Sequence, residues 1–179
     1  MKILLIILFL TSSFSKSYAQ FNYDSINWRQ KILNEIKAED QIIDHYLKEG
    51  KKVDSLFRHI SINEAISYFE DSSYVIKYYS FIRIMELNDS TAFEYLKTYI
   101  KDSTEIVHQM SCMNSTEHFN MLIGEDYKRY MKYKYSYTSF TIKGRTYLSE
   151  KVNHKKRKKM MKEVDRLFSE NGLKPIKVY

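Results

Sequence analysis

Apolar residues recur at every third or fourth position along most of the chain, which is the spacing of an amphipathic helix. Capping residues bound several of these segments: Ser61 with Glu64 three residues later forms a capping box, and Gly50 is placed to end a helix. In chain order the pattern predicts helices from Asp24-Ser25 to Gly50, over 53–59, from Ser61 to Phe69, from Asp71 to Leu87, from Thr91 to Lys101, and from Asp102 to Cys112 or Met113.

The helix predicted from Asp71 to Leu87 is apolar on two faces. One face carries Ile76, Ser80, Ile84 and Leu87, and the other carries Tyr74, Tyr78, Phe81 and Met85. A helix that is apolar on both sides is stable only between neighbours. We therefore expect this helix to lie in the middle of a helical stack.

The segment 71–80 recurs in similar form at 102–111, a period of 31 residues. Both copies open with Asp-Ser and carry an aliphatic pair, and the preceding residues Tyr68-Phe69-Glu70 align with Tyr99-Ile100-Lys101. Helix pairs at a fixed period are typical of a helical solenoid. The alternative is chance similarity, because Asp-Ser begins many helices.

The unit from Asp71 to Asp102 follows a recognisable order of an Asp turn, an aliphatic-basic pair and small or aliphatic core positions. These positions are Ile76-Lys77, Ser80 and Ile84 in the first helix, and Asp89, Ala92, Leu96 and Ile100 in the second. The pattern resembles a HEAT-like repeat of the short bacterial type, over about residues 61–118, although Lys77 and His108 stand where that family has Arg. The resemblance implies a short α-α solenoid.

After Gly124 the pattern changes. Tyr residues are interleaved with Lys and Arg, and the strict alternation from Lys132 to Tyr137 favours an extended segment, with a short hairpin around Lys143-Gly144. A last helix is predicted from Ser149 to Ser169, with Asn171-Gly172 as its C-cap.

From Asn153 to Lys159 this last helix has no apolar residue, and the apolar residues that follow lie in its second half. We expect Met161, Val164, Leu167 and Phe168 to pack on the end of the stack, while Lys151 to Lys159 stay exposed.

The N-terminal residues are typical of a secretory signal peptide: Met1-Lys2 is basic, 3–10 is apolar, and small residues precede Gln20. We expect cleavage after Ala19, export to the periplasm or beyond, and no transmembrane span in the mature chain, because a span needs about 20 apolar residues. The expected organisation is a signal peptide over 1–19, a helical-repeat domain over 20–123, a basic Tyr-rich connection over 124–148, and a basic C-terminal helix and tail over 149–179.

Composition supports a packed helical fold. The 179 residues are 44% hydrophobic and 15% aromatic, which is enough apolar material for a core, while 4 Gly and 1 Pro disfavour tight-turned β architectures. The single Cys excludes an internal disulfide framework. The fold class predicted is all-α: a short helical-repeat stack capped by a C-terminal helix, with an extended Tyr/Lys-rich connection.

Charge is divided unevenly along the chain. Residues 20–123 carry 11 basic and 16 acidic residues, whereas residues 124–179 carry 16 basic and 6 acidic ones. This asymmetry indicates either an anionic partner or docking of the basic part on the acidic body. In an exported protein, nucleic acid is disfavoured as that partner.

Motifs for catalysis are missing from the sequence: it has no nucleophile elbow, phosphate-binding Gly loop or calcium loop. His108 and Cys112, followed by Glu117-His118, have a spacing that zinc accepts, but the repeat places Cys112 at a packing position. We therefore predict a non-enzymatic protein with no catalytic residue, cofactor or metal.

Two functions remain. The first hypothesis is an exported interaction module that binds an unidentified protein or peptide through its helical-repeat surface. The alternative is a binder of an anionic envelope surface, either lipid headgroups or acidic polysaccharide, that uses the basic C-terminal region. The candidate contacts to an anion are Lys128, Arg129, Lys132, Lys134, Lys155, Lys156, Arg157, Lys158 and Lys159, and the candidate aromatic contacts are Tyr130, Tyr133, Tyr135 and Tyr137.

Overall fold

The computed structural model describes residues 28–38, 41–43, 48–71, 73–110, 113–137, 139–142, 145–148 and 152–177. The chain forms two compact units, Met1–Glu35 and Ile36–Tyr179. A helix covers residues 28–38, within the first helix that the pattern predicts. The predicted signal peptide and its cleavage site after Ala19 lie outside the described residues.

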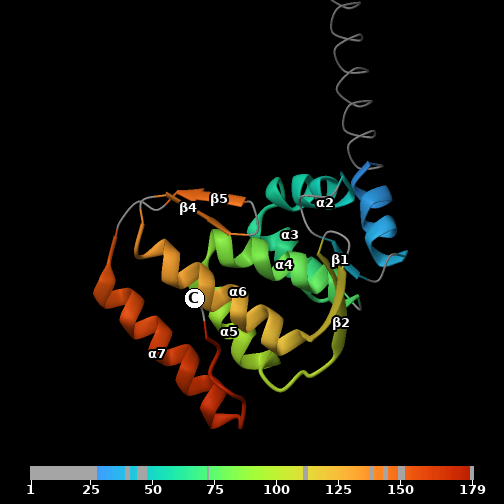
Figure 1. Cartoon of the computed structure of the whole chain (residues 1–179). Helices are drawn as coiled ribbons and strands as arrows, with labels where there is room; N and C mark the ends of the chain where they lie inside the picture. Colours follow the sequence, from blue (N-terminus) through green and yellow to red (C-terminus); the bar gives the residue numbers. More distant parts are fainter. Residues whose placement is uncertain are drawn as a thin grey trace, which may run out of the picture. The chain divides into compact units, whose positions relative to one another are not determined.

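The second unit combines helices with two small sheets (Figure 1). Its helices are α2 (Lys48–Arg58), α3 (Ile62–Phe69), α4 (Tyr74–Leu87), α5 (Asp89–Tyr99), α6 (Phe119–Lys134) and α7 (His154–Glu170). Its strands are β1 (Gln41–Ile43), β2 (Glu105–Met110), β3 (Met113–His118), β4 (Ser139–Ile142) and β5 (Arg145–Leu148).

Helix α4 lies at the centre of this unit, as the two apolar faces predict. It packs against α2, α3, α5, α6 and β1. Ile76, Phe81 and Ile84 are fully buried, and even the hydroxyl-bearing Ser80 is enclosed. Two residues depart from the prediction: Leu87 is exposed at the end of the helix, and Tyr74 at its start is half-buried.

Local capping accounts for several helix boundaries. Ser61 and Glu64 form the predicted capping box at the start of α3. Asn88 caps α5 through its side chain, so that helix begins two residues before the predicted Thr91. At the C-terminal end of α7, Gly172 adopts a positive φ of 73°, as expected for a residue just beyond a helix.

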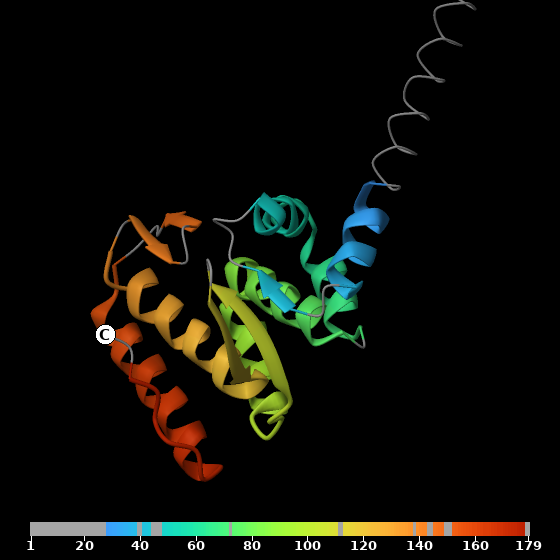
Figure 2. The same ribbon diagram turned by 45° about the vertical axis from the view of Figure 1, so that its right-hand side comes forward.

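The all-α prediction is wrong, because the unit contains a mixed sheet of order β1-β2-β3. Strand β2 pairs parallel with β1 and antiparallel with β3, where a helix was predicted from Asp102 to Cys112 or Met113. The buried residues Ile106 and His108 alternate with the exposed Glu105 and Val107, which is a strand period that a helical alignment overlooks. Figure 2 shows the β2–β3 hairpin leading into α6.

The first predicted helix is also corrected. It was expected to continue to Gly50, but Ile43 belongs to strand β1 and Gly50 lies inside α2. Three residues are too few to show a strand period in the sequence, and β1 is stabilised by pairing with β2.

The extended connection predicted over 124–148 is wrong in its first part. Helix α6 runs through Gly124 to Lys134 and buries Ile123, Tyr127 and Met131 at helical spacing. The two-residue alternation covers only the last turn of α6 and the residues just after it, and this is too short to decide the conformation. The hairpin is confirmed: β4 and β5 pair antiparallel with Ile142 opposite Arg145, on either side of Lys143-Gly144.

Candidate anion-binding surface

Helix α7 is held against α6 by the apolar residues of its second half. Val164 and Phe168 are buried, as the sequence predicts, whereas Met161 and Leu167 are half-buried. The ring of Phe168 packs onto Gly124 of α6 so closely that a Cβ at that position would overlap it. Figures 1 and 2 show the two helices side by side.

Lys128 fastens this contact from the α6 side. Its side chain is only 5% exposed, and its Nζ donates to the Asp165 carboxylate of α7 and to the backbone carbonyl of Ile176. A buried ammonium group is stable only with such partners. Lys128, a predicted anion contact, is therefore committed to binding α7 and the tail.

The outward face of α7 carries a stripe of cations. Lys155, Lys158, Lys159 and Lys162 follow the spacing i, i+3, i+4 and i+7, and Arg166 continues it. This spacing places them on the face opposite the buried Val164, and all five are exposed. We call these five residues the basic stripe. Lys162 and Arg166 were not among the predicted contacts, although their spacing is visible in the sequence.

The N-terminal part of the stripe has little compensating negative charge. Residues 152–162 contain six basic and no acidic residues. Farther along, Lys159 Nζ lies 3.8 Å from Glu163 and Arg166 Nε lies 3.5 Å from Glu170, in exposed pairs that contribute little to stability. Cations at the start of a helix also oppose its dipole, so this arrangement does not favour stability of α7.

Four other predicted cations have contacts within the fold. On α6, Arg129 pairs with Glu125 one turn earlier, and Lys132 Nζ lies 5.3 Å from the centroid of the Tyr133 ring. On α7, Arg157 donates to the Ser136 hydroxyl at 2.7 Å, and Lys156 Nζ lies 4.7 Å from the centroid of the Tyr135 ring. Each of these four cations therefore has a contact inside its own unit.

Lys134 belongs to a polar cluster centred on Asp89, at the start of α5. The Asp89 carboxylate accepts from the Tyr135 hydroxyl at 2.7 Å and lies 3.2 Å from Lys134 Nζ. Burial alone would raise the pKa of Asp89, but the Tyr135 hydrogen bond and Lys134 lower it below its ordinary value. Burial and the neighbouring carboxylate raise the pKa of Tyr135, which therefore stays a neutral donor.

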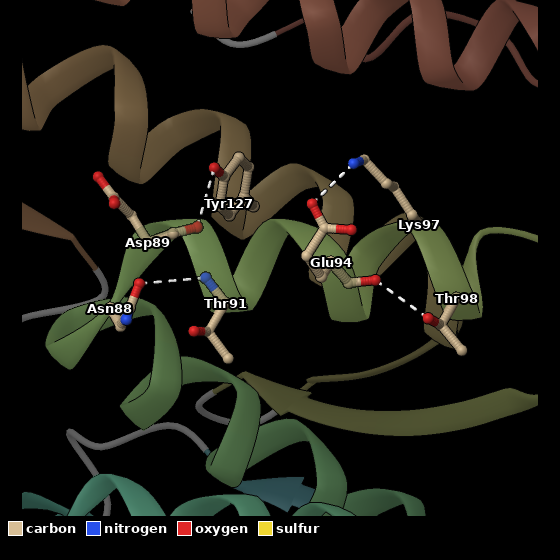
Figure 3. Close-up of polar contacts among 7 residues, drawn as sticks. All are labelled: Asn88, Asp89, Thr91, Glu94, Lys97, Thr98 and Tyr127. Atoms are coloured by element: carbon tan, nitrogen blue, oxygen red, sulfur yellow. Dashed lines mark hydrogen bonds and ion pairs between the residues drawn. The ribbon is translucent and has the colours of Figure 1, made fainter.

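A second contact joins α5 to α6 at the same residue. The Tyr127 hydroxyl donates to the Asp89 backbone carbonyl at 3.2 Å, beside the Asn88 cap on Thr91 N (Figure 3). Farther along α5, Lys97 pairs with Glu94 across exposed surface. Asp89, an ionised carboxylate paired with Lys134, thus connects the start of α5 to α6 and to Tyr135 just after it.

The four predicted aromatic contacts separate into two pairs. Tyr130 and Tyr135 are buried, so their rings belong to the core. Tyr133 and Tyr137 form a tilted ring pair with centroids 5.9 Å apart. Tyr137 is exposed and is the one of the four that is open to a partner.

The zinc spacing considered in the sequence is not assembled in the part of the chain that the structure describes. Among those residues, no three His, Cys, Asp or Glu side chains form a group that could hold a metal. His108 Nδ1 lies 3.9 Å from Glu117, while His118 Nδ1 contacts the Ser103 carbonyl. Cys112 lies outside the described residues.

Within the described residues, no helix has both the length and the apolar character required to cross a membrane. Comparison of the chain with protein-family models, with curated proteins and with solved structures gives no match.

Proposed function

We propose that this protein is a binding module that attaches to a surface rich in phosphate, sulfate or carboxylate groups through the basic stripe of α7. The observation that carries the proposal is the stripe itself: Lys155, Lys158, Lys159 and Lys162 share one exposed face, and the helix is docked through the opposite face. A stripe from Lys155 to Arg166 is about 16 Å long, which is enough to engage several anions at once.

The rigid docking of α7 supports this function. Phe168 on Gly124 and Lys128 on Asp165 fix the helix, so the cations are presented without ordering a loose tail on binding. Each Lys near an anionic surface contributes about 1 kcal/mol. Four such residues therefore support an attachment that weakens steeply as salt increases.

A protein or peptide partner, the first hypothesis from the sequence, stays a prediction. The stack of helix pairs that motivated it is interrupted by β2 and β3, which replace the predicted helix over 102–113. We therefore propose an anionic surface as the partner, because variants of the basic stripe test it directly.

The test compares two variants with the same change in charge. The stripe variant carries Lys155→Gln, Lys158→Gln, Lys159→Gln and Lys162→Gln, and the control carries Lys51→Gln, Lys101→Gln, Lys174→Gln and Lys177→Gln, four exposed residues on other segments. Binding is measured on immobilised heparin and on vesicles containing phosphatidylglycerol, at low and high salt.

The stripe variant should lose on the order of 100-fold or more in affinity for at least one of the two probes. The control should lose far less, and both should keep the free energy of unfolding within about 0.5 kcal/mol of the original chain. Equal losses in the two variants would show that net charge, and not the stripe, drives attachment. No salt-dependent binding to either probe would refute the proposal.

A further inference from the structure

Three large apolar side chains are exposed on segments that meet at the C-terminal end of α6. Leu87 is 44% exposed, Tyr137 is 54% exposed and Val152 is 40% exposed. They come from separate segments: the end of α4, the residues after α6, and the residues before α7. We call them the apolar triplet.

Hydrogen bonds bring these three segments together at the C-terminal end of α6. Leu87 precedes by two residues Asp89, whose carboxylate accepts from Tyr135. The residue after Val152 donates its backbone N–H to the Tyr135 carbonyl at 3.1 Å, and Tyr137 N donates to Tyr133 O. Each member of the triplet therefore lies within two residues of a group that is hydrogen-bonded to the stretch from Tyr133 to Tyr135.

The basic stripe begins at the same place. Lys155 follows Val152 by three residues, and Arg157 in the first turns of α7 donates to Ser136, next to Tyr137. Cations and exposed apolar side chains thus lie at the same end of the unit, where the carboxylate of Asp89 is bonded to Tyr135 and Lys134.

We infer that the surface bound by this protein is an anionic phospholipid bilayer, with the basic stripe on the headgroup phosphates and the apolar triplet at the headgroup–acyl boundary. This inference rests on the proposed function and names its partner. Tyr and aliphatic side chains gain free energy in that boundary, next to Lys residues whose charges stay in water. A soluble polyanion offers the stripe its charges but offers Leu87 and Val152 no apolar phase to enter.

The first experiment removes the apolar triplet and leaves every cation in place. The variants are Leu87→Ser/Tyr137→Ser/Val152→Ser and the double variant Tyr137→Ser/Val152→Ser, which spares α4. The control is Val107→Ser, an apolar side chain exposed on β2. Binding of the full chain is measured on phosphatidylcholine vesicles with and without phosphatidylglycerol, and on heparin.

We expect both triplet variants to bind vesicles containing phosphatidylglycerol about tenfold more weakly, because apolar burial is lost. Their affinity for heparin should be unchanged, and Val107→Ser should change neither. Vesicles of phosphatidylcholine alone give the baseline for binding that does not depend on anionic lipid. Circular dichroism and urea unfolding establish that each variant is folded.

A local reporter provides a second measurement. In a Trp28→Phe background, which removes the single Trp of the chain, Tyr137→Trp places a fluorophore in the triplet. Its emission should shift to shorter wavelength and be quenched by brominated lipid when phosphatidylglycerol vesicles bind, but not when heparin binds.

The outcomes separate this inference from the proposed function. Vesicle binding that is unaffected in both triplet variants, with no shift in the emission of the Tyr137→Trp reporter, would overturn the bilayer inference while the stripe could still bind anions. Binding to heparin without binding to phosphatidylglycerol vesicles would also overturn it, in favour of an acidic polysaccharide. If both proposals hold, the Lys→Gln stripe variant loses binding to vesicles and to heparin, whereas the triplet variants lose binding to vesicles alone.

Discussion

The same turn occurs twice in this chain and is followed once by a helix and once by a strand. After α3, Asp71 N donates to Tyr68 O at 3.1 Å, and the Asp71 carboxylate accepts from Ser73 N at 2.9 Å. After α5, Asp102 N donates to Tyr99 O at 3.0 Å, and its carboxylate accepts from Thr104 N at 3.1 Å. The repeated sequence therefore encodes a real local structure: a helix end and an Asx turn.

The two segments that follow these turns differ in what surrounds them. Helix α4 buries both members of its aliphatic pair, Val75 and Ile76, because helices lie on several sides of it. Strand β2 buries Ile106 but exposes Val107, since one face of the sheet is open. The turn is set by local chemistry, whereas the next element is set by its tertiary partners.

The largest expected effect is a difference between two matched truncations. Ile76 is completely buried, whereas Val107, its counterpart in the repeat, is 37% exposed. Ile76→Ala should lower the free energy of unfolding by about 2–5 kcal/mol, and Val107→Ala should change it by about 0.5 kcal/mol or less. Urea unfolding followed by circular dichroism measures both.

Comparable losses in the two variants would contradict the strand at 105–110, because a helix in a solenoid would bury both aliphatic residues. Val75→Ala and Ile106→Ala are the matched controls. Both residues are buried, at 1% and 4% exposure, so both truncations should be costly.

The next effect concerns the two turn carboxylates and depends on pH. Burial alone would raise the pKa of Asp71 and Asp102, but hydrogen bonds lower both pKa values below the ordinary value. Asp71 accepts from Lys37 and Ser73, and Asp102 accepts from Thr104 and Tyr74. The stability they contribute is therefore present above about pH 4 and is lost as the pH falls through the lowered values.

The variant Asp71→Asn/Asp102→Asn tests this dependence, because Asn keeps the Asx turn and removes the charge. At pH 7 each substitution should cost about 1 kcal/mol. The difference from the original chain should shrink as the pH falls below about 4, in urea unfolding curves measured at each pH. A difference that stays constant down to about pH 2 would show that the charge of these carboxylates contributes no stability.

How far the sequence predicts the fold depends on the length of each signal. The capping box at Ser61, the central helix α4 and the C-terminal Gly172 follow from local patterns that span whole elements. The strands β1 and β2 do not, because β1 has three residues and β2 is stabilised by its pairing with chain from before α2 and after β2. Their partners are visible only in three dimensions.

The candidate surface was predicted in part for a similar reason. The exposed positions of Lys155, Lys158 and Lys159 agree with the lack of apolar residues in that half of α7. The buried positions of Lys128 and Tyr135 depend on Asp165 and Asp89, which lie 37 and 46 residues away in the chain. The sequence around a Lys or Tyr does not indicate that it will pair with a carboxylate far away in the chain.

The smallest expected effect comes from the bond that joins the two turns. The Tyr74 hydroxyl, at the start of α4, donates to the Asp102 carboxylate at 2.7 Å. Tyr74→Phe should cost about 0.5–1.5 kcal/mol of unfolding free energy, since it removes the hydroxyl that bonds Asp102 and Thr104 and keeps the ring over which Lys77 lies. Tyr137→Phe, in an exposed side chain, is the control and should cost nothing measurable.

In a double-mutant cycle, Tyr74→Phe should cost much less when Asp102 is already Asn, because a neutral amide oxygen accepts the bond more weakly than a carboxylate. Independent, fully additive losses would mean that the two turns do not stabilise each other, and that the start of α4 is held by its own cap at Ser73 alone.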